Sequence, residues 1–354
     1  MFRATVLLSL ATLSLGLASG DLRVTLRAGA ASVSSVDDIV ISAVVSNPTD
    51  QDIRVIAKNN VLDTSATRSF VVSKDGKDVL FAGIRATYDL TAEGVYTTIP
   101  AGSSVAVNHT NLGPLYDFET SGTGRFTFTA TNIFQTAPDT PALVVDAPPV
   151  IVQVTDDVQK RPLLSPSLST PTCSDAGKLA VIRDSLAGAR AMAGGAATDI
   201  RTHPTSSEFT TYFGGNSQDE IWWRMDIIAG DLASSGTRII GCTDPAGICG
   251  GTGGVIAYTL VVTSGGQIVG SDIYTCPIFF TAVSDTPRIC TDGFDSTTSS
   301  KAGVILHELS HATAGTSDLG YGCSVTAGLS TANKLNNADN YRCMGSAIYR
   351  HYNC

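Results

Sequence analysis

The eight cysteines of this chain are confined to its second half. The sequence has 354 residues, the first cysteine is Cys173, and all the others follow it. At roughly 150 residues per domain, this length suggests two domains, each able to bury a core of its own. An even number of cysteines gathered in one part of an exported chain is typical of a disulfide framework. The distribution therefore predicts two units of different construction, of which only the second is cross-linked.

Residues 1–20 have the pattern of a signal peptide for secretion. Arg3 is followed by an apolar stretch that runs to Ala18 and ends in small residues. A membrane anchor is the alternative, but the stretch is shorter than the roughly 20 residues that span a bilayer. We therefore expect a secreted, extracellular protein whose cysteines are paired.

Residues 21–161 alternate polar and apolar side chains as β-strands do. Segments such as 39–45 and 125–129 show this alternation, and turn signals such as Asp75-Gly76 separate them. Short strands at this spacing predict a β-rich, antiparallel sandwich. We find no cluster of His, Glu or Asp in this half that resembles a site.

A linker rich in Ser, Thr and Pro is expected at residues 162–172, directly after the dibasic pair Lys160-Arg161. Proteolytic nicking concentrates on exposed segments of this kind. We interpret the pair as a processing site that separates a pro-domain, 21–161, from a mature domain, 173–354. An ordinary charged pair in a linker is the alternative.

Residues 173–354 follow a different, helix-rich pattern. Apolar residues recur at helical spacing in five segments, and three strand-like segments lie between them. The expected helices are 176–192, 219–233, 299–314, 324–336 and 338–352, and the expected strands are 238–242, 255–262 and 267–274. This half is therefore predicted to be α+β, with a small β-sheet and mostly helices.

The sequence His-Glu-Leu-Ser-His at residues 307–311 lies inside one of these helices. Histidines four residues apart lie on one face of a helix, so His307 and His311 can bind one metal ion. Glu308 points to the side, where it can take a proton from a zinc-bound water that attacks a peptide carbonyl. The alternative is a pair of packed histidines, but buried imidazoles and a carboxylate need partners, and zinc is the simplest one. The motif predicts one catalytic Zn²⁺.

A catalytic zinc site needs a third protein ligand. Gly315 can end the helix in a left-handed conformation, and Asp318, three residues later, can fold back to the metal. No other histidine lies nearby in the sequence. Metzincins have a glycine three residues and a histidine six residues after the second histidine, so both the spacing and the ligand differ here.

These residues resemble the deuterolysin family of fungal neutral zinc proteases, the aspzincins. The shared pattern is His-Glu-x-x-His followed by Gly-Thr-x-Asp-x-x-Tyr-Gly, which occupies residues 315–322. The resemblance implies that His307, His311 and Asp318 bind zinc and that the glutamate between the histidines is the general base. It also implies that Tyr321 donates a hydrogen bond to the oxyanion.

The resemblance extends to the layout of a signal peptide, a cysteine-free pro-region and a cysteine-rich catalytic domain. It implies that Asp339 lies near the zinc and the pocket on the primed side; in the lysine-specific branch such an acid recognises the basic side chain of the substrate. A salt-bridging surface aspartate is the alternative for Asp339. The family framework also suggests disulfides and leaves one extra pair: Cys173–Cys242, Cys249–Cys276, Cys290–Cys354 and, as the extra pair, Cys323–Cys343.

The charge of the chain limits its partners. The net charge is −9 and there is no Lys/Arg run, which argues against nucleic acid and anionic membranes as partners. From residue 162 onward, 11 Lys and Arg stand against 16 Asp and Glu. Together with the resemblance, this suggests protein or peptide substrates that are basic, such as histones and protamines. We expect a monomer.

Two other functions are compatible with parts of the pattern. One is a metzincin-like protease with an aspartate as third ligand, and the other is a non-catalytic secreted binding protein with a β-sandwich. For the zymogen, the lack of cysteine before Cys173 excludes a thiolate that blocks the zinc. We expect the pro-domain to cover the cleft sterically, assisted by a carboxylate or by His109.

Overall fold

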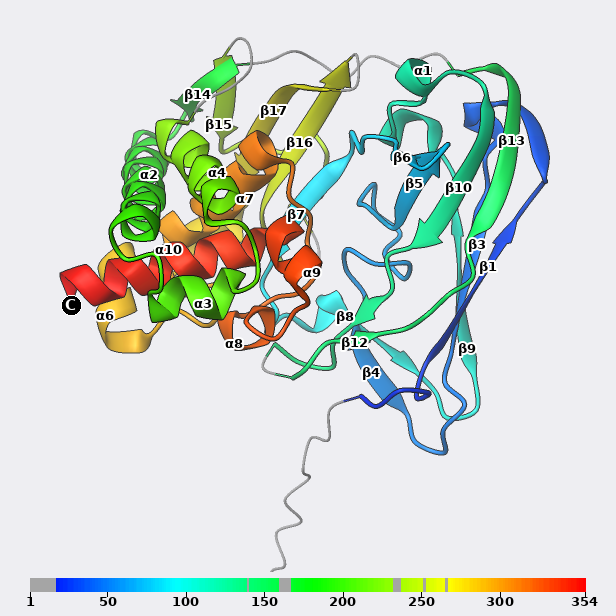
Figure 1. The fold of residues 1–354 in the computed structure, drawn as a ribbon, viewed down its shortest axis with the longest axis horizontal. Coiled ribbons are helices and arrows are strands. Elements are labelled where there is room, and N and C mark those ends of the chain that lie inside the picture. Colours follow the sequence, from blue (N-terminus) through cyan, green and yellow to red (C-terminus); the bar gives the residue numbers. More distant parts are fainter. Residues whose placement is uncertain (1–16, 139, 159–166, 232–236, 251–252, 265–266) are drawn as a thin grey trace, which may run out of the picture.

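The structure is a computed structural model that describes residues 17–138, 140–158, 167–231, 237–250, 253–264 and 267–354 (Figure 1). Most of the predicted signal peptide and the pair Lys160-Arg161 lie outside the described residues. The β-rich N-terminal half and the helix-rich C-terminal half lie side by side (Figure 1). The predicted fold class, an α+β domain preceded by a β-rich, sandwich-like one, is confirmed.

Two sheets build the N-terminal half. The first has the order β1 (Arg23–Ala28), β3 (Ile41–Ser46), β9 (Ser104–His109), and the second β2 (Ser32–Ser35), β13 (Val150–Asp157), β10 (Gly124–Ala130), β5 (Phe70–Lys74), β6 (Lys77–Asp78). All neighbours are antiparallel except β2 and β13, which pair in parallel. Buried and exposed residues alternate along β3 and β10, so each strand presents one face to the core. Side chains from both sheets form that core, including Ile41, Val45, Phe70, Phe126 and Phe128.

Shorter elements complete this half. They are β4 (Ile53–Ile56) paired with β8 (Tyr96–Ile99), β11 (Ile133–Phe134) paired with β12 (Leu143–Val144), the short helix α1 (Phe118–Ser121), and 3₁₀ turns at Val36–Asp38, Glu93–Val95 and Gly113–Leu115. One further strand of the N-terminal half, β7 (Ile84–Tyr88), pairs with β16 (Val255–Ser264) and so belongs to the sheet of the C-terminal half.

The sheet of the C-terminal half has the order β14-β15-β17-β16-β7. Its own strands are β14 (Ser167–Thr172), β15 (Thr237–Gly241), β16 (Val255–Ser264) and β17 (Gln267–Thr275). β14, β15 and β17 are parallel, whereas β16 is antiparallel to β17 and β7 is antiparallel to β16. β14 falls within the stretch expected to be a linker, so the sheet begins before Cys173.

Helices cover this sheet (Figure 1). They are α2 (Ala176–Thr202), α3 (Ser207–Phe213), α4 (Gln218–Gly230), α5 (Pro277–Thr281), α6 (Ile289–Asp292), α7 (Lys301–Ala314), α8 (Cys323–Thr326), α9 (Thr331–Asn336) and α10 (Ala338–Asn353), with a 3₁₀ turn at Thr286–Arg288. The core joins α2, α4, α7 and α10 through apolar side chains that include Met192, Met225, Leu306 and Met344. No helix in the described part of the chain has the length and apolar character needed to cross a membrane.

Four disulfides link elements within the C-terminal half. They join Cys173 to Cys242, Cys249 to Cys276, Cys290 to Cys354 and Cys323 to Cys343. This is the pairing that the family resemblance suggested, with the extra pair included.

Candidate metal centre

Helix α7 carries the paired histidines through the middle of the C-terminal half. The Ser300 side chain caps its first turn by accepting a hydrogen bond from Gly303 N, and Gly315, at φ 68°, ends it. All residues of α7 from Ala302 to Ala312 are buried, since the helix packs against α2 and α10 and against β7, β16 and β17. A helix enclosed in this way holds its side chains in fixed positions.

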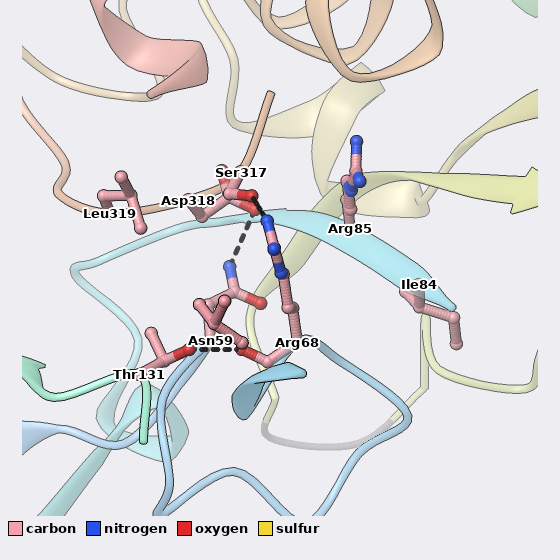
Figure 2. Close-up of a pocket in the computed structure, with 9 residues that line it drawn as sticks. Asn59, Arg68, Ile84, Arg85, Thr131, Ser317, Asp318 and Leu319 are labelled. Atoms are coloured by element: carbon pink, nitrogen blue, oxygen red, sulfur yellow. Dashed lines mark hydrogen bonds between the residues drawn. The ribbon is translucent and has the colours of Figure 1, made fainter. Parts of the chain in front are cut away.

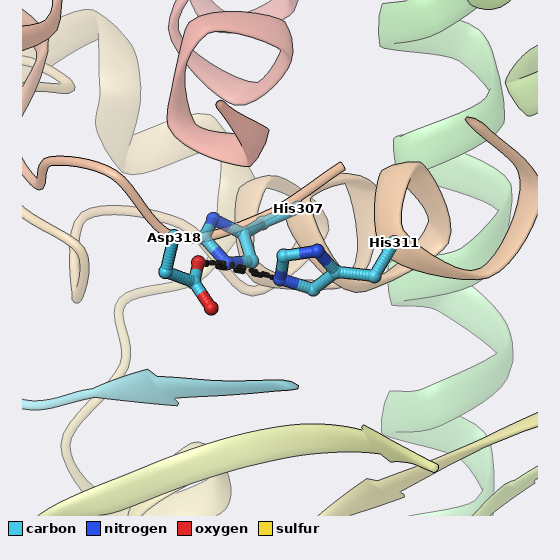
Figure 3. Close-up of side chains that lie close together, drawn as sticks. All are labelled: His307, His311 and Asp318. Atoms are coloured by element: carbon cyan, nitrogen blue, oxygen red, sulfur yellow. Dashed lines mark hydrogen bonds and ion pairs between the residues drawn. The ribbon is translucent and has the colours of Figure 1, made fainter. Parts of the chain in front are cut away.

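His307, His311 and Asp318 converge on one point (Figure 3). The two imidazole Nε2 atoms are 3.1 Å apart, and Asp318 Oδ1 lies 2.8 Å from His307 Nε2 and 3.3 Å from His311 Nε2. Both histidine side chains are fully buried, and that of Asp318 is almost so. The structure thus brings together the three residues that the sequence predicts as metal ligands.

The outer nitrogen of each ring shows why a cation fits here. His307 Nδ1 lies 2.8 Å from Asp339 Oδ1, and His311 Nδ1 lies 2.9 Å from the carbonyl oxygen of Thr316. Because both partners are acceptors, each Nδ1 is the protonated nitrogen and each Nε2 keeps its lone pair. Two lone pairs and a carboxylate oxygen therefore face one another, and a cation satisfies all three. Two nitrogens and one oxygen are the donor set of a catalytic zinc site with an open position.

The charges around the cluster agree with that interpretation. Burial alone lowers the pKa of His307, but the Asp318 and Asp339 carboxylates outweigh it and raise the pKa to about 10. Burial raises the pKa of Asp318, yet the two imidazoles hold it well below its usual range. The carboxylates therefore favour a positive charge at the imidazoles, either a proton or, in its place, a metal ion bound through the Nε2 lone pairs.

Glu308 lies on α7 between the two histidines and is fully buried. Its Oε1 accepts a hydrogen bond of 2.6 Å from Thr87 Oγ1, and its Oε2 accepts one of 2.6 Å from Thr259 Oγ1. Burial raises the pKa of this carboxyl group, and the nearby histidines and hydroxyl groups offset only part of that shift. A carboxylate with a raised pKa is suited to accept a proton near neutral pH.

The loop that carries Asp318 is fastened to the start of α10. Asn337 Oδ1 accepts hydrogen bonds from Leu319 N at 2.8 Å and Gly320 N at 3.3 Å, and its Nδ2 donates to the Gly320 carbonyl. Ser317 and Ala338 add a backbone hydrogen bond of 2.9 Å. The sequence does not single out Asn337, because an asparagine before a helix is common and its partners lie 17 and 18 residues away.

Asp339 lies behind His307, on the side away from the cluster. Besides His307 Nδ1, its carboxylate accepts hydrogen bonds from Arg342 Nε at 2.8 Å, from Arg342 Nη2 at 3.0 Å and from Gly322 N at 2.9 Å. It is fully buried. This placement favours a role in orienting His307, and recognition of a substrate side chain by Asp339 stays a prediction.

Tyr321 is buried beside the cluster. Its hydroxyl group contacts Asn59 Nδ2 and donates to the Ala86 carbonyl at 3.4 Å. Burial, together with the Asp318 charge, raises the pKa of this phenol well above its ordinary value, so it remains a hydrogen-bond donor. His109 lies elsewhere: it is buried in the N-terminal sandwich, where its Nε2 lies 3.0 Å from the Val61 carbonyl.

Comparisons with known proteins agree on one family. The family model described as lysine-specific metallo-endopeptidase matches residues 200–345. The chain is 29% identical to a neutral protease 2 homolog of Aspergillus fumigatus over 96% of this chain and 76% of that protein. It is 26% identical to penicillolysin of Penicillium citrinum over 89% of this chain and 90% of that protein. A solved zinc peptidase from Grifola frondosa matches at 18% identity with a TM-score of 0.33, over 49% of this chain and 96% of that one, which is too distant to support an argument.

Proposed function

Because this chain belongs to the aspzincin family and is a zinc metalloendopeptidase, we propose that its catalytic site is the cluster of His307, His311 and Asp318. The matches confirm the family resemblance drawn from the motifs. One observation carries the assignment of the site: two imidazole lone pairs and a carboxylate oxygen converge beside the buried carboxylate of Glu308. The family match favours this enzyme over a metzincin-like protease and over a non-catalytic binding protein.

The residues around the cluster divide the chemistry of peptide hydrolysis between them. His307, His311 and Asp318 would hold the zinc ion, which would supply a Lewis acid for the peptide carbonyl and lower the pKa of water towards 7. Glu308 accepts the proton of the attacking water and passes it to the leaving amine. Tyr321 donates its phenolic hydrogen to the carbonyl oxygen as negative charge develops there. Asp339 fixes the ring of His307 through Nδ1, which keeps Nε2 turned towards the metal.

We also propose that the enzyme is secreted as a zymogen and that scission near Lys160-Arg161 releases the catalytic half. The paired cysteines support an extracellular destination, and the contact between Thr87 and Glu308 supports a latent precursor. The excess of acidic residues after residue 161 supports a preference for basic proteins.

Metal analysis combined with two variants tests the assignment. We expect one zinc per chain by mass spectrometry, and loss of casein cleavage by the processed enzyme when a chelator removes the metal. Glu308→Gln should keep its zinc, because the ligands are untouched, and should lose turnover by at least about a hundredfold. Asp318→Ala is the matched comparison, and it should lose zinc as well as activity. Wild-type turnover in Glu308→Gln would refute the mechanism, and normal zinc retention in Asp318→Ala would move the third ligand elsewhere.

A further inference from the structure

Strand β7 lies along an edge that the C-terminal half would otherwise leave open. Without β7, the sheet order is β14-β15-β17-β16, so β16 is its last strand. β7 pairs antiparallel with β16, placing Ile84 opposite Leu260 and Ala86 opposite Tyr258. An unpaired strand edge is a template on which an extended peptide can dock through its main chain.

The same strand runs directly past the candidate metal centre. Side chains two residues apart on a strand point to the same face, and those of Arg85 and Thr87 point towards α7. Thr87 Oγ1 donates to Glu308 Oε1 at 2.6 Å, and Arg85 Nη1 donates to the His311 carbonyl at 3.3 Å. The Ala86 carbonyl between them accepts a hydrogen bond from Tyr321. β7 therefore contacts the proposed general base and the proposed oxyanion donor at once.

Asn59 fills the space between this strand and a metal ligand. Its Nδ2 lies 3.1 Å from the Ala86 carbonyl oxygen and 3.0 Å from Asp318 Oδ2, and it also contacts the Tyr321 hydroxyl group. Asn59 has a left-handed backbone, φ 55°, and Asp63 Oδ2 holds it there by accepting a hydrogen bond from Asn59 N at 2.9 Å. The backbone of Asn59 is thus held by a residue of its own half, while its side chain contacts the other half.

Further hydrogen bonds join the two halves next to β7. Thr297 Oγ1 donates to the Tyr88 carbonyl at 2.9 Å, and Arg68 Nη1 donates to Ser317 Oγ at 2.7 Å. Asn59, Arg68 and Asp318 line a cavity of about 30 Å³ that remains between the halves (Figure 2). That volume holds about one or two water molecules and no peptide.

We propose that the edge of β16, residues 255–260, is the docking surface for an extended peptide substrate, and that β7 and Asn59 occupy it in a substrate-like but non-productive way. The proposal rests on the proposed function. Occupation is non-productive because the Thr87 hydroxyl group takes the Glu308 oxygen that an attacking water needs, and because the Asn59 amide separates the Ala86 carbonyl from Asp318. Since every disulfide lies after residue 172, the N-terminal half remains after scission as a non-covalent, reversible inhibitor.

Variants of the uncut chain test this blockade. In a Lys160→Ala/Arg161→Ala background, Thr87→Val and Asn59→Ala each remove hydrogen bonds from the contact and leave the catalytic half unchanged. Each should raise peptide turnover by about tenfold or more, the scale of a buried hydrogen bond to a charged group. Each should also speed zinc removal by a chelator by a similar factor, which is a readout independent of activity. Thr98→Val, at an exposed position of β8, is the control and should match the parent chain.

A second measurement does not depend on how the variants fold. The wild-type chain is cut after Lys160 with trypsin, and the products are examined by size-exclusion chromatography and peptide cleavage. The halves should elute together with low activity, and separation in mild denaturant followed by dilution should yield an active C-terminal half. The proposal is overturned if the uncut chain is as active as the separated C-terminal half, or if both variants behave as Thr98→Val does. A separated C-terminal half that lacks zinc and activity would instead refute the proposed function, and co-elution would still report on the docking.

Discussion

The N-terminal half encloses an apolar core of aliphatic side chains and phenylalanine rings and contains no cysteine, whereas the C-terminal half connects its elements with four disulfides. The candidate metal centre lies in the cross-linked half. Cys323–Cys343 joins α8, just after Tyr321, to α10, which begins beside Asp339. This cross-link therefore joins the segment that follows Tyr321 to the helix that carries Asp339.

The contrast indicates that the two halves have different requirements for stability against unfolding. In the proposed zymogen, the C-terminal half has to keep its proposed metal ligands in place after the halves separate, and cross-links resist unfolding when no partner is bound. On the same proposal, the N-terminal half has only to hold β7 and Asn59 in place until the chain is cut. An ordinary sandwich core is sufficient for that task. Each prediction below changes one side of this comparison.

The largest effect is expected from the core of the N-terminal half. Phe128 on β10 is fully buried and its ring packs edge to face with Phe70, with centroids 6.1 Å apart. Phe128→Ala should destabilise this half by about 3–5 kcal/mol, as measured by denaturant unfolding. The unfolding of the C-terminal half should not change, and Thr129→Ala, at an exposed neighbouring position, should leave both unchanged. An equal loss in the free energy of unfolding of both halves would show that they unfold as one unit, which would contradict the separate stabilities proposed here.

A smaller loss is expected when a cross-link of the C-terminal half is removed. Cys290 and Cys354 are 64 residues apart in the chain, and their disulfide joins α6 to the segment after α10. Replacing both by alanine should cost about 2–4 kcal/mol in the unfolding of this half. The same change at Cys249 and Cys276, which are 27 residues apart, should cost less because the closed loop is shorter. The unfolding of the N-terminal half is the internal control, and a parallel loss there would contradict the prediction.

The smallest effect concerns the orientation of a single ligand. Asp339→Asn weakens the hydrogen bond that fixes His307 Nδ1, and we expect zinc affinity to fall by about 10- to 100-fold. Competition with a fluorescent chelator measures this affinity, and a thermal melt of the same sample monitors folding. Asp226→Asn, on the exposed side of α4, is the matched control. Unchanged zinc affinity together with weaker cleavage of lysine-containing peptides would favour the role in a substrate pocket instead.

The sequence predicts the parts of the site that obey local rules. The helix at 299–314 was expected from its apolar spacing, and it forms over Lys301–Ala314 with both histidines on one face. Gly315 ends it with the left-handed backbone that a glycine at this position predicts. The position of Asp318 can also be predicted, because a residue three positions after the end of a helix can fold back to the last turn of that helix. The disulfide pairing came from the family resemblance, since eight cysteines allow too many pairings for spacing to decide.

Contacts between distant segments could not be predicted in the same way. Nothing in residues 84–88 indicates that their partner strand begins at Val255, about 170 residues later. β14 forms in a Ser-, Thr- and Pro-rich stretch whose composition does not indicate a strand. It can form there because strand pairing uses the main chain. The helix expected over 324–336 divides into α8 and α9, since the Ser330 side chain caps a new first turn by accepting from Asn333 N.

Because the N-terminal half contains no cysteine, no disulfide joins it to the C-terminal half, and this affects when the enzyme becomes active. While the chain is continuous, its two halves face each other at an effective concentration on the order of millimolar. If the chain is cut as proposed, no disulfide holds the two halves together, and their association then depends on the actual concentration of the protein. On this proposal, scission makes dissociation of the halves possible, and dilution into the surroundings then causes it and uncovers the catalytic site. A cell that released such a precursor would be protected where the protein is most concentrated, at its own surface.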